Sequence, residues 1–232
     1  MRLNDDLSVP TRVHAGEMDW TQSPARGVER RMLFRIGEET ARATSIVRYA
    51  PQSQFPRHGH PGGEEFLVLE GVFQDETGDF PAGTYVRNPP GTAHAPGSRT
   101  GCVILVKLWQ FRQDDRHRVV RFPGDGETAA TGAGAPSTRL LFDAVGERVA
   151  ITTWAAGADM VLPNPDGLEL LVLDGSARDA DERLDRWTWL RLPAGTSFRA
   201  QAGAEGVRVW SKHAPLLHDD VVRMDMAPTP AS

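Results

Sequence analysis

Short runs of apolar and β-branched residues recur along the first half of the chain, and Gly- or Pro-containing turns separate them. The clearest runs are residues 43–49, 66–69, 71–74, 84–87 and 103–109. Short strands at this spacing are typical of a β-sandwich or a β-barrel. Residues 1 to about 40 show only weak periodicity, so we expect irregular chain or short strands there.

The pattern of the first half recurs in the second half at a constant offset. Glu65–Gly71 recurs as Glu169–Gly175, and Tyr85–Thr92 recurs as Trp189–Thr196, in both cases 104 residues later. One offset shared by two separate motifs indicates a tandem duplication of a single β domain.

Between the two copies lies a segment of small and polar residues, 123–138, that is rich in Gly and Ala and contains little to bury. We read it as a linker or a long surface loop. The sequence therefore predicts an all-β protein with a first domain at 1–122, a linker at 123–138 and a second domain at 139–232.

Two motifs framed by Gly and Pro contain the candidate chemistry of the first domain. His58 and His60 lie two residues apart, so on a strand both imidazoles point to one face. His94 follows a Pro-Pro-Gly turn that would direct a new strand back toward this pair. Three imidazoles with one carboxylate, from either Glu64 or Glu65, form a ligand set for a single divalent metal ion.

The internal repeat helps to choose the carboxylate and shows what the second copy has lost. Glu65 is retained as Glu169, whereas Glu64 is replaced by Leu168, so we assign Glu64 as the ligand and Glu65 as a structural residue. The three histidine positions change as well, His58 to Leu162, His60 to Asn164 and His94 to Phe198. We therefore expect no equivalent metal site in the second domain.

Other aromatic and titratable residues receive a structural interpretation. In the second domain we expect tryptophans to fill the barrel interior, with an apolar ligand pocket as the alternative; they are Trp154, Trp187, Trp189 and Trp210. Four histidines have no partner at ligand spacing, and we expect them to be exposed or hydrogen-bonded; they are His14, His117, His213 and His218.

Ligand type alone does not select the metal, because imidazole and carboxylate accommodate zinc, iron(II), manganese, cobalt, nickel or copper. Closed tetrahedral zinc would use all four ligands, whereas a five- or six-coordinate ion would keep an open position. This difference separates a structural or sensory site from a catalytic one.

Composition and charge exclude several classes of protein. The chain has 232 residues and a formal net charge of −5, which argues against a general binder of nucleic acid or of anionic membranes. Its single cysteine, Cys102, lies in an apolar run and is interpreted as a small buried residue. No apolar run approaches the length of a membrane span, so we expect a cytoplasmic protein.

The metal motifs resemble those of the cupin family. His58-x-His60-x-x-x-Glu64 followed by Gly71 is similar to the first cupin motif, and Gly83 through Pro89 and Gly91 to His94 is similar to the second. The second motif departs from the usual pattern at Ser98, where an Asn is customary.

Further segments of the first half resemble the ChrR-type cupin group in particular. They are Glu29–Leu33, Phe55–His60, Gly78–Gly83 and Gly101–Lys107. The resemblance implies two tandem jelly-roll barrels, the second degenerate, with one metal ion held by His58, His60, Glu64 and His94. Zinc is the metal implied by the regulatory members, and iron(II), manganese or nickel are the alternatives.

The resemblance implies a sensory or regulatory role, because ChrR-type cupins include the zinc-binding domain of anti-sigma factors that respond to oxidative stress. We expect no N-terminal anti-sigma module here and thus no direct capture of a sigma factor. The alternative is a metal-dependent enzyme, a dioxygenase or an isomerase acting on a small molecule. Expected partners are a small molecule at the metal, a regulatory protein and a second copy of the chain.

Overall fold

The structure is a computed structural model that describes residues 1–232 except 39, 129–133, 145, 181 and 217–232. Its contacts divide the described chain into two units. Of the described residues, unit 1 comprises Met1–Asp5 and Asp19–Pro123, and unit 2 comprises Asp6–Met18 and the chain from Gly124 to Leu216. Both units are built from antiparallel strands, which confirms the predicted all-β class.

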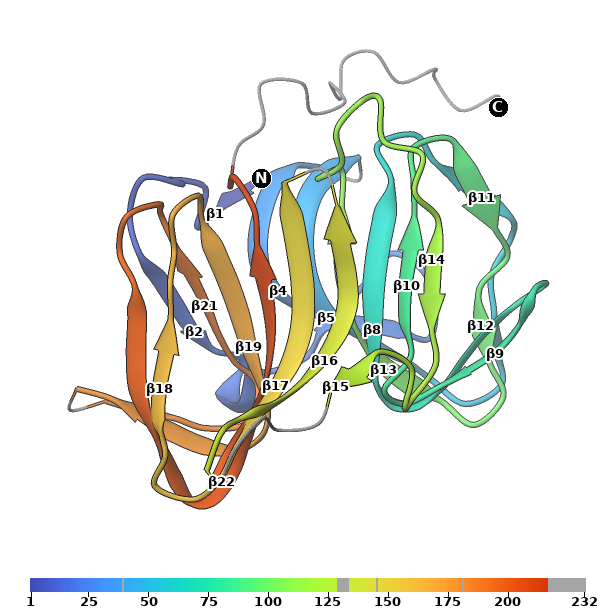
Figure 1. Ribbon diagram of the computed structural model, residues 1–232. Coiled ribbons are helices and arrows are strands. Elements are labelled where there is room, and N and C mark those ends of the chain that lie inside the picture. The colour runs from blue at the N-terminus through green and yellow to red at the C-terminus, as the bar shows by residue number, and fades with distance from the viewer. Residues whose placement is uncertain (39, 129–133, 145, 181, 217–232) are drawn as a thin grey trace. The chain divides into compact units, whose positions relative to one another are not determined.

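Unit 1 contains the strands of the first repeat. They are β1 (Arg2–Leu3), β3 (Thr21–Gln22), β4 (Val28–Gly37), β5 (Ala41–Tyr49), β6 (Ser53–Gln54), β7 (His58–His60), β8 (Glu64–Asp75), β9 (Gly78–Pro81), β10 (Tyr85–Asn88), β11 (Thr92–His94), β12 (Gly97–Ser98), β13 (Cys102–Leu108) and β14 (Val119–Arg121). The main sheet has the order β1-β4-β5-β13-β8-β10-β14 (Figure 1). β7 and β11 form a separate pair, β9 and β12 pair with β8, and β6 pairs with β12.

The N-terminal region is more regular than its sequence suggested. β4 is a strand of 10 residues and pairs with β5 along its length. Hydrophobic periodicity does not predict this strand, because several of its residues are charged. Their partners lie on neighbouring segments of the sheet. Glu29 is opposite Arg48 and accepts a hydrogen bond from its Nε at 2.8 Å. The guanidinium groups of Arg31 and Arg48 lie 4.3 and 4.4 Å from the centre of the Trp20 ring.

β8 joins two of the predicted strands into one strand of 12 residues. Its first part pairs with β10 and β13, and its last part pairs with β9 and β12. Phe66 and Val68 belong to the apolar core of the unit, and Glu64 has the same parity along the strand. Glu65 and Leu67 therefore face the other side.

A bulge and a glycine bend this strand. The register with β13 passes from Val68 opposite Ile104 to Glu70 opposite Val103, so Leu69 is the extra residue of a β-bulge. Gly71 follows with φ +69°, and a Cβ atom there would lie 2.1 Å from the carbonyl oxygen of Gly101. Only glycine fits this combination of left-handed backbone and close approach.

Unit 2 contains the strands of the second repeat together with a short N-terminal segment. Its elements are β2 (Thr11–His14), the 3-10 turn η1 (Ala15–Glu17), β15 (Glu127–Thr128), β16 (Ser137–Ala144), β17 (Glu147–Trp154), β18 (Asp159–Leu162), β19 (Leu168–Asp179), β20 (Glu182–Leu184), β21 (Thr188–Leu192) and β22 (Phe198–His213). The sheet has the order β15-β16-β17-β22-β19-β21-β2, with β18 paired to β22 and β20 to β19.

The N-terminal segment of unit 2 lies outside the predicted second domain. β2 pairs with β21, with Thr11 opposite Arg191 and His14 opposite Thr188. The edge of β21 offers unpaired backbone groups to this segment, and Arg12 adds ion pairs with Asp179 and Glu182. Unit 1 and the predicted domain 1–122 therefore differ at Asp6–Met18. Of the predicted linker, residues 129–133 lie outside the described residues.

The repeat seen in the sequence is also a repeat of backbone detail. The register of β19 with β22 passes from Val172 opposite Val209 to Asp174 opposite Arg208, so Leu173 is the extra residue and corresponds to Leu69. Gly175 has φ +69°, and a Cβ there would lie 2.2 Å from the carbonyl oxygen of Gly206. In both units, the equivalent strands β8 and β19 are therefore bent by a bulge followed by a glycine.

The tryptophans of unit 2 are buried, but they do not all fill the barrel interior. Trp154 belongs to the apolar core with Leu190 and Val209. Trp189 and Trp210 adjoin these residues in the sequence and therefore face the opposite side of the sheet. The prediction of a tryptophan-filled interior is wrong for these two residues, because it took no account of strand parity.

The glycine at the bend provides a test of this architecture. We expect Gly175→Ala to lower the free energy of unfolding by about 3 kcal/mol or more, since strained backbone and a steric clash act together. Gly195→Ala is the matched control, because Gly195 has φ +91° but no atom within 4 Å of an added Cβ. It should cost only about 1–2 kcal/mol. Urea unfolding measures both, and equal losses would contradict the proposed role of the close approach.

Candidate metal centre

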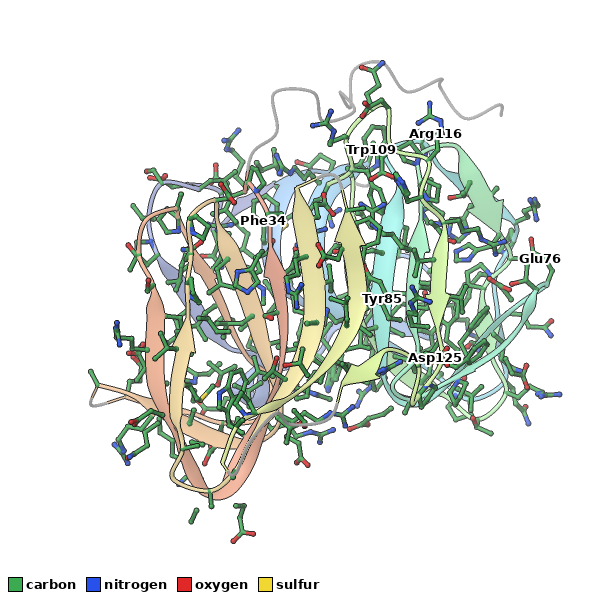
Figure 2. All side chains as sticks on the ribbon, viewed as in Figure 1. Phe34, Glu76, Tyr85, Trp109, Arg116 and Asp125 are labelled. Atoms are coloured by element: carbon green, nitrogen blue, oxygen red, sulfur yellow. The ribbon has the colours of Figure 1, made fainter. Side chains whose placement is uncertain are left out.

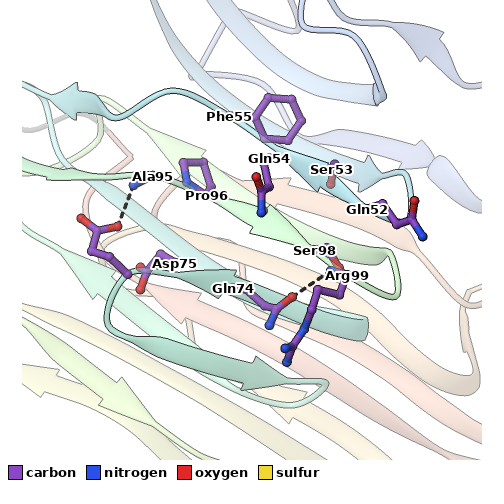
Figure 3. A pocket seen from close by; sticks show the side chains of 12 residues that line it. Gln52, Ser53, Gln54, Phe55, Gln74, Asp75, Ala95, Pro96, Ser98 and Arg99 are labelled. Atoms are coloured by element: carbon purple, nitrogen blue, oxygen red, sulfur yellow. Dashed lines mark hydrogen bonds between the residues drawn. The ribbon is translucent and has the colours of Figure 1, made fainter.

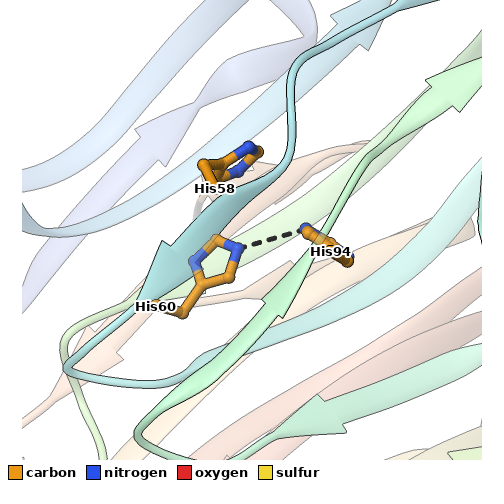
Figure 4. A group of neighbouring side chains, drawn as sticks. All are labelled: His58, His60 and His94. Carbon is orange, nitrogen blue, oxygen red and sulfur yellow. Dashed lines mark hydrogen bonds between the residues drawn. The ribbon is translucent and has the colours of Figure 1, made fainter.

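The three predicted histidines meet on the paired strands β7 and β11. His58 lies directly opposite His94, and His60 lies opposite Thr92. Because His58 and His60 are two residues apart on β7, their side chains share the face that receives His94. Figure 4 shows the three imidazoles pointing toward one another.

The distances place the three rings around one point. The Nε2 atoms of His60 and His94 are 3.1 Å apart. The ring centre of His58 lies 4.9 Å from that of His60 and 5.4 Å from that of His94. One ligand atom from each histidine lies within 4.8 Å of the other two, which is close enough for a single ion to bind all three.

The two candidate carboxylates lie on opposite sides of β8. Glu64 Oε2 is 3.5 Å from His94 Nε2 and 3.7 Å from His60 Nε2, and Asn88 Nδ2 donates to it at 3.3 Å. Glu65 instead accepts a hydrogen bond from the hydroxyl of Tyr85 at 2.8 Å. The geometry therefore places Glu64 beside the histidines and Glu65 on the other face.

Hydrogen bonds at the Nδ1 atoms of His58 and His94 fix the orientation of these two rings. His58 Nδ1 lies 3.0 Å from the carbonyl oxygen of Pro56, and His94 Nδ1 lies 3.3 Å from Asp75 Oδ2. Since both partners are acceptors, each Nδ1 carries the proton and each Nε2 offers a lone pair to the centre. His60 Nε2 and His94 Nε2 are hydrogen-bonded to each other beside the Glu64 carboxylate, and a cation could take the place of the shared proton. The residues thus fit a divalent metal ion.

Burial and hydrogen bonding act differently on the two buried histidines. Burial lowers the pKa of His60 below its ordinary value, which favours the neutral ring that a metal requires. Burial also disfavours the charged form of His94, but the hydrogen bond that His94 donates to Asp75 and the charge of Glu64 outweigh it and raise the pKa of His94. The pKa values of the two buried rings are therefore shifted in opposite directions.

The turn between β8 and β9 supports both histidine strands. Asp75 accepts hydrogen bonds from Thr77 as well as from His94. Glu76, at the edge of unit 1 (Figure 2), accepts from the backbone N–H of Ala95 at 2.8 Å and forms an ion pair with Arg57. Arg57 precedes His58 and Ala95 follows His94, so this one side chain holds the chain beside both ligands.

Access to the centre is uneven. His60, Glu64 and His94 are buried, whereas His58 is exposed, so the His58 side of the centre faces solvent. A cavity of about 680 Å³ has Asp75 in its wall (Figure 3). Its walls include Gln54, Phe55, Asp75, Ala95 and Ser98. Asp75 both lines the cavity and contacts His94, whereas the three histidines do not line it.

The two supporting residues, Asp75 and Glu76, carry no local signal in the sequence. Asp75 and Glu76 lie in a Gln-Asp-Glu-Thr-Gly sequence that resembles any surface turn. They are recognisable only by their position, since Asp75 ends the strand that begins with Glu64 and Glu76 follows it. This position has a meaning only once β8 is known to be a single bent strand.

The equivalent positions in unit 2 are occupied by apolar core and by one amide. Leu168 and Phe198 are buried in the core cluster, and Leu162 packs against it. Asn164 donates to the carbonyl oxygens of Pro193 at 2.7 Å and Thr196 at 3.0 Å. In the part of the chain that the structure describes, the His58, His60 and His94 group is the only cluster of this kind at ligand distance.

The remaining histidines and the cysteine have local roles. His14 contacts Glu182 at 2.7 Å and His117 contacts Asp115 at 3.2 Å. Cys102 is buried, and burial raises the pKa of its thiol to about 11, so it stays protonated. His218 lies outside the described residues. No helix within those residues is both long and apolar enough to cross a membrane.

The fold and the histidine cluster define a protein of two cupin barrels with a candidate metal centre in the first. Residues 8–112 match the family described as the ChrR cupin-like domain, and this part of the chain is such a domain. The family resemblance of the sequence is thereby confirmed. A comparison with curated protein sequences gives no significant match.

Several solved structures share the two-barrel fold at low sequence identity. A candidate dioxygenase from Nostoc punctiforme has a TM-score of 0.71 and 14% identity, over 97% of this chain and 88% of that one. The bacterial pirin YhhW from Escherichia coli, in complex with nickel(II), has a TM-score of 0.62 and 14% identity, over 89% and 100%. Lactobacillus farciminis oxalate decarboxylase, in a formate complex, has a TM-score of 0.59 and 11% identity, over 89% and 86%.

Metal analysis of single variants tests the ligand set. We expect His60→Ala and His94→Ala to lose nearly all bound metal, because each removes a buried ligand. Glu64→Gln should weaken binding far more than Glu65→Gln, since Glu65 lies on the other face. His117→Ala is the control that keeps its metal. Unchanged metal content in the His94 variant, or a larger loss in the Glu65 variant, would disprove the assignment.

Asp75→Asn tests the support of the ligands. An amide can no longer hold the Nδ1 proton of His94 as strongly, so metal affinity should fall by about 10- to 100-fold. Competition with a coloured chelator measures this affinity. Asp79→Asn is the matched control, because Asp79 lies nearby and pairs with Arg99 at the surface. Equal affinities for the two variants would show that Asp75 does not orient the ring.

Proposed function

We propose that the protein is a metal-dependent enzyme that acts on a small molecule at the centre formed by His58, His60, Glu64 and His94. The observation that carries this proposal is the exposure of His58 while the other three residues are buried. A closed structural site would surround its ion with buried groups. An ion held here is open on one side, where a substrate atom can approach it.

A dioxygenase is the reaction class that these residues support best, with iron(II) as the metal. Such a metal, when bound, supplies a place where the substrate and molecular oxygen meet and exchange electrons. Both oxygen atoms enter the product, so no external reductant is needed. The chain's own part is to hold the ion with one carboxylate and three imidazoles, to fix His94 through Asp75, and to admit the substrate beside His58. The candidate dioxygenase of similar fold is consistent with this proposal.

A regulatory zinc site is the second candidate. It is supported by the match of residues 8–112 to the ChrR cupin-like domain. In that case the ion would be zinc, and binding of a small molecule or oxidation at the centre would change how the barrel contacts a partner protein. Nickel in the pirin complex shows that a protein of similar fold accepts other divalent ions.

Cobalt(II) substitution distinguishes an open centre from a closed one. We expect the weak visible absorption of five- or six-coordinate cobalt, and we expect azide to change it by taking the open position. Intense tetrahedral absorption that azide leaves unchanged would contradict the enzyme proposal and favour the zinc site. The variant His117→Ala should behave like the parent protein. Elemental analysis of the protein as isolated then decides between iron and zinc.

A further inference from the structure

Unit 2 contains a cavity of its own, with a volume of about 460 Å³. This volume lies within the range of sites for small molecules. The cavity opens between β16, β17, β18 and the end of β22, and its lining residues all belong to unit 2. It does not depend on the metal centre of unit 1.

The floor of the cavity is the barrel interior. Trp154 and Leu162 line it and also belong to, or pack on, the apolar core of the unit. Ser211 and His213 continue the inward-facing row of Val207 and Val209 on β22. Apolar walls therefore meet a small number of polar groups, which is the usual composition of a ligand site.

The two repeats differ at the strand end beside this cavity. Leu108 lies opposite Glu64 in unit 1, and His213 lies opposite Leu168 in unit 2, so Leu108 and His213 are equivalent. The next residue is Trp109 in unit 1 and Ala214 in unit 2. Trp109 is buried and packs so tightly on Gly62 that a Cβ there would lie 2.2 Å from its ring. Ala214 has a much smaller side chain, so the two strand ends are packed differently.

One cationic side chain stands at the rim of the cavity. Arg148 lines the cavity and pairs with Asp143 at 2.5 Å, with half of each side chain exposed. An exposed pair of this kind contributes little free energy, so a bound anion can take the place of Asp143. Burial lowers the pKa of His213 below its ordinary value, so this ring is a neutral hydrogen-bonding group. Hydroxyls of Thr152 and Ser211 add further donors.

We propose that the second barrel binds a small carboxylate with an apolar body. The carboxylate faces Arg148 and the hydroxyl groups at the rim, and the apolar body packs on Trp154 and Leu162 inside the barrel. The degenerate barrel is then a binding site in its own right, which took up an organic anion after its metal ligands were replaced.

Cinnamate and its neutral analogue, cinnamyl alcohol, test the proposal by calorimetric titration of the full chain. We expect one cinnamate per chain, and about tenfold weaker binding of the alcohol because it lacks the charge. Arg148→Gln should remove this tenfold preference and leave the binding of the alcohol unchanged. Arg199→Gln is the matched control, since Arg199 is an exposed arginine of β22 that does not line the cavity.

A second variant tests the apolar part of the site. Ala150→Leu fills the cavity from β17 and should abolish the binding of both compounds, while an unchanged near-ultraviolet circular dichroism spectrum shows that the barrel is folded. The methyl resonances of Thr152 and Leu162 should shift on addition of cinnamate to the parent protein. Absence of binding at millimolar cinnamate, equal affinity for the alcohol, or unchanged affinity in Arg148→Gln would each overturn the proposal.

Discussion

The bend of β8 is the constraint on which the metal centre depends. This strand begins with Glu64 and ends with Asp75, and the two carboxylates lie 3.5 and 3.3 Å from the two nitrogens of the same imidazole, His94. A straight strand would separate its ends by about 36 Å. The bulge at Leu69 and the left-handed backbone at Gly71 curl the strand so that one element supplies both a ligand and the group that orients another ligand.

The electrostatics of the centre follow from this arrangement. Asp75 and the carbonyl of Pro56 hold protons on the outer nitrogens of His94 and His58, so the inner nitrogens have lone pairs that face the Glu64 carboxylate. These groups would not be placed together in a purely structural core, because each adds negative potential to the same point. The ion pair of Glu76 with Arg57 lies outside the centre and stabilises the chain that carries His58. The strands, the hydrogen bonds and the charges therefore all favour a bound cation.

The sequence was informative where the chemistry is local. His58 and His60 reveal a shared face through their spacing, and the loss of Glu64 but not Glu65 in the repeat points to the residue that the structure places beside them. Asp75 could not be found in this way, because its contact with His94 spans 19 residues and depends on a bend. The pairing of β2 could not be predicted either, since its partner β21 lies in the other repeat. Strand periodicity describes which face a residue takes, but not which distant edge it meets.

The second barrel shows which features belong to the fold and which to the metal. It retains the bulge at Leu173 and the glycine at 175, yet Leu168 and Phe198 take the places of two ligands within a packed core. The barrel therefore has the same architecture without the candidate ligand set, so a metal ion is not needed to define it. Freed from the ligand set, the second copy could also change the residues at its mouth. The second copy holds a cavity lined by Arg148 and His213 where the first copy holds the histidine cluster, so one scaffold carries different side chains at its two mouths.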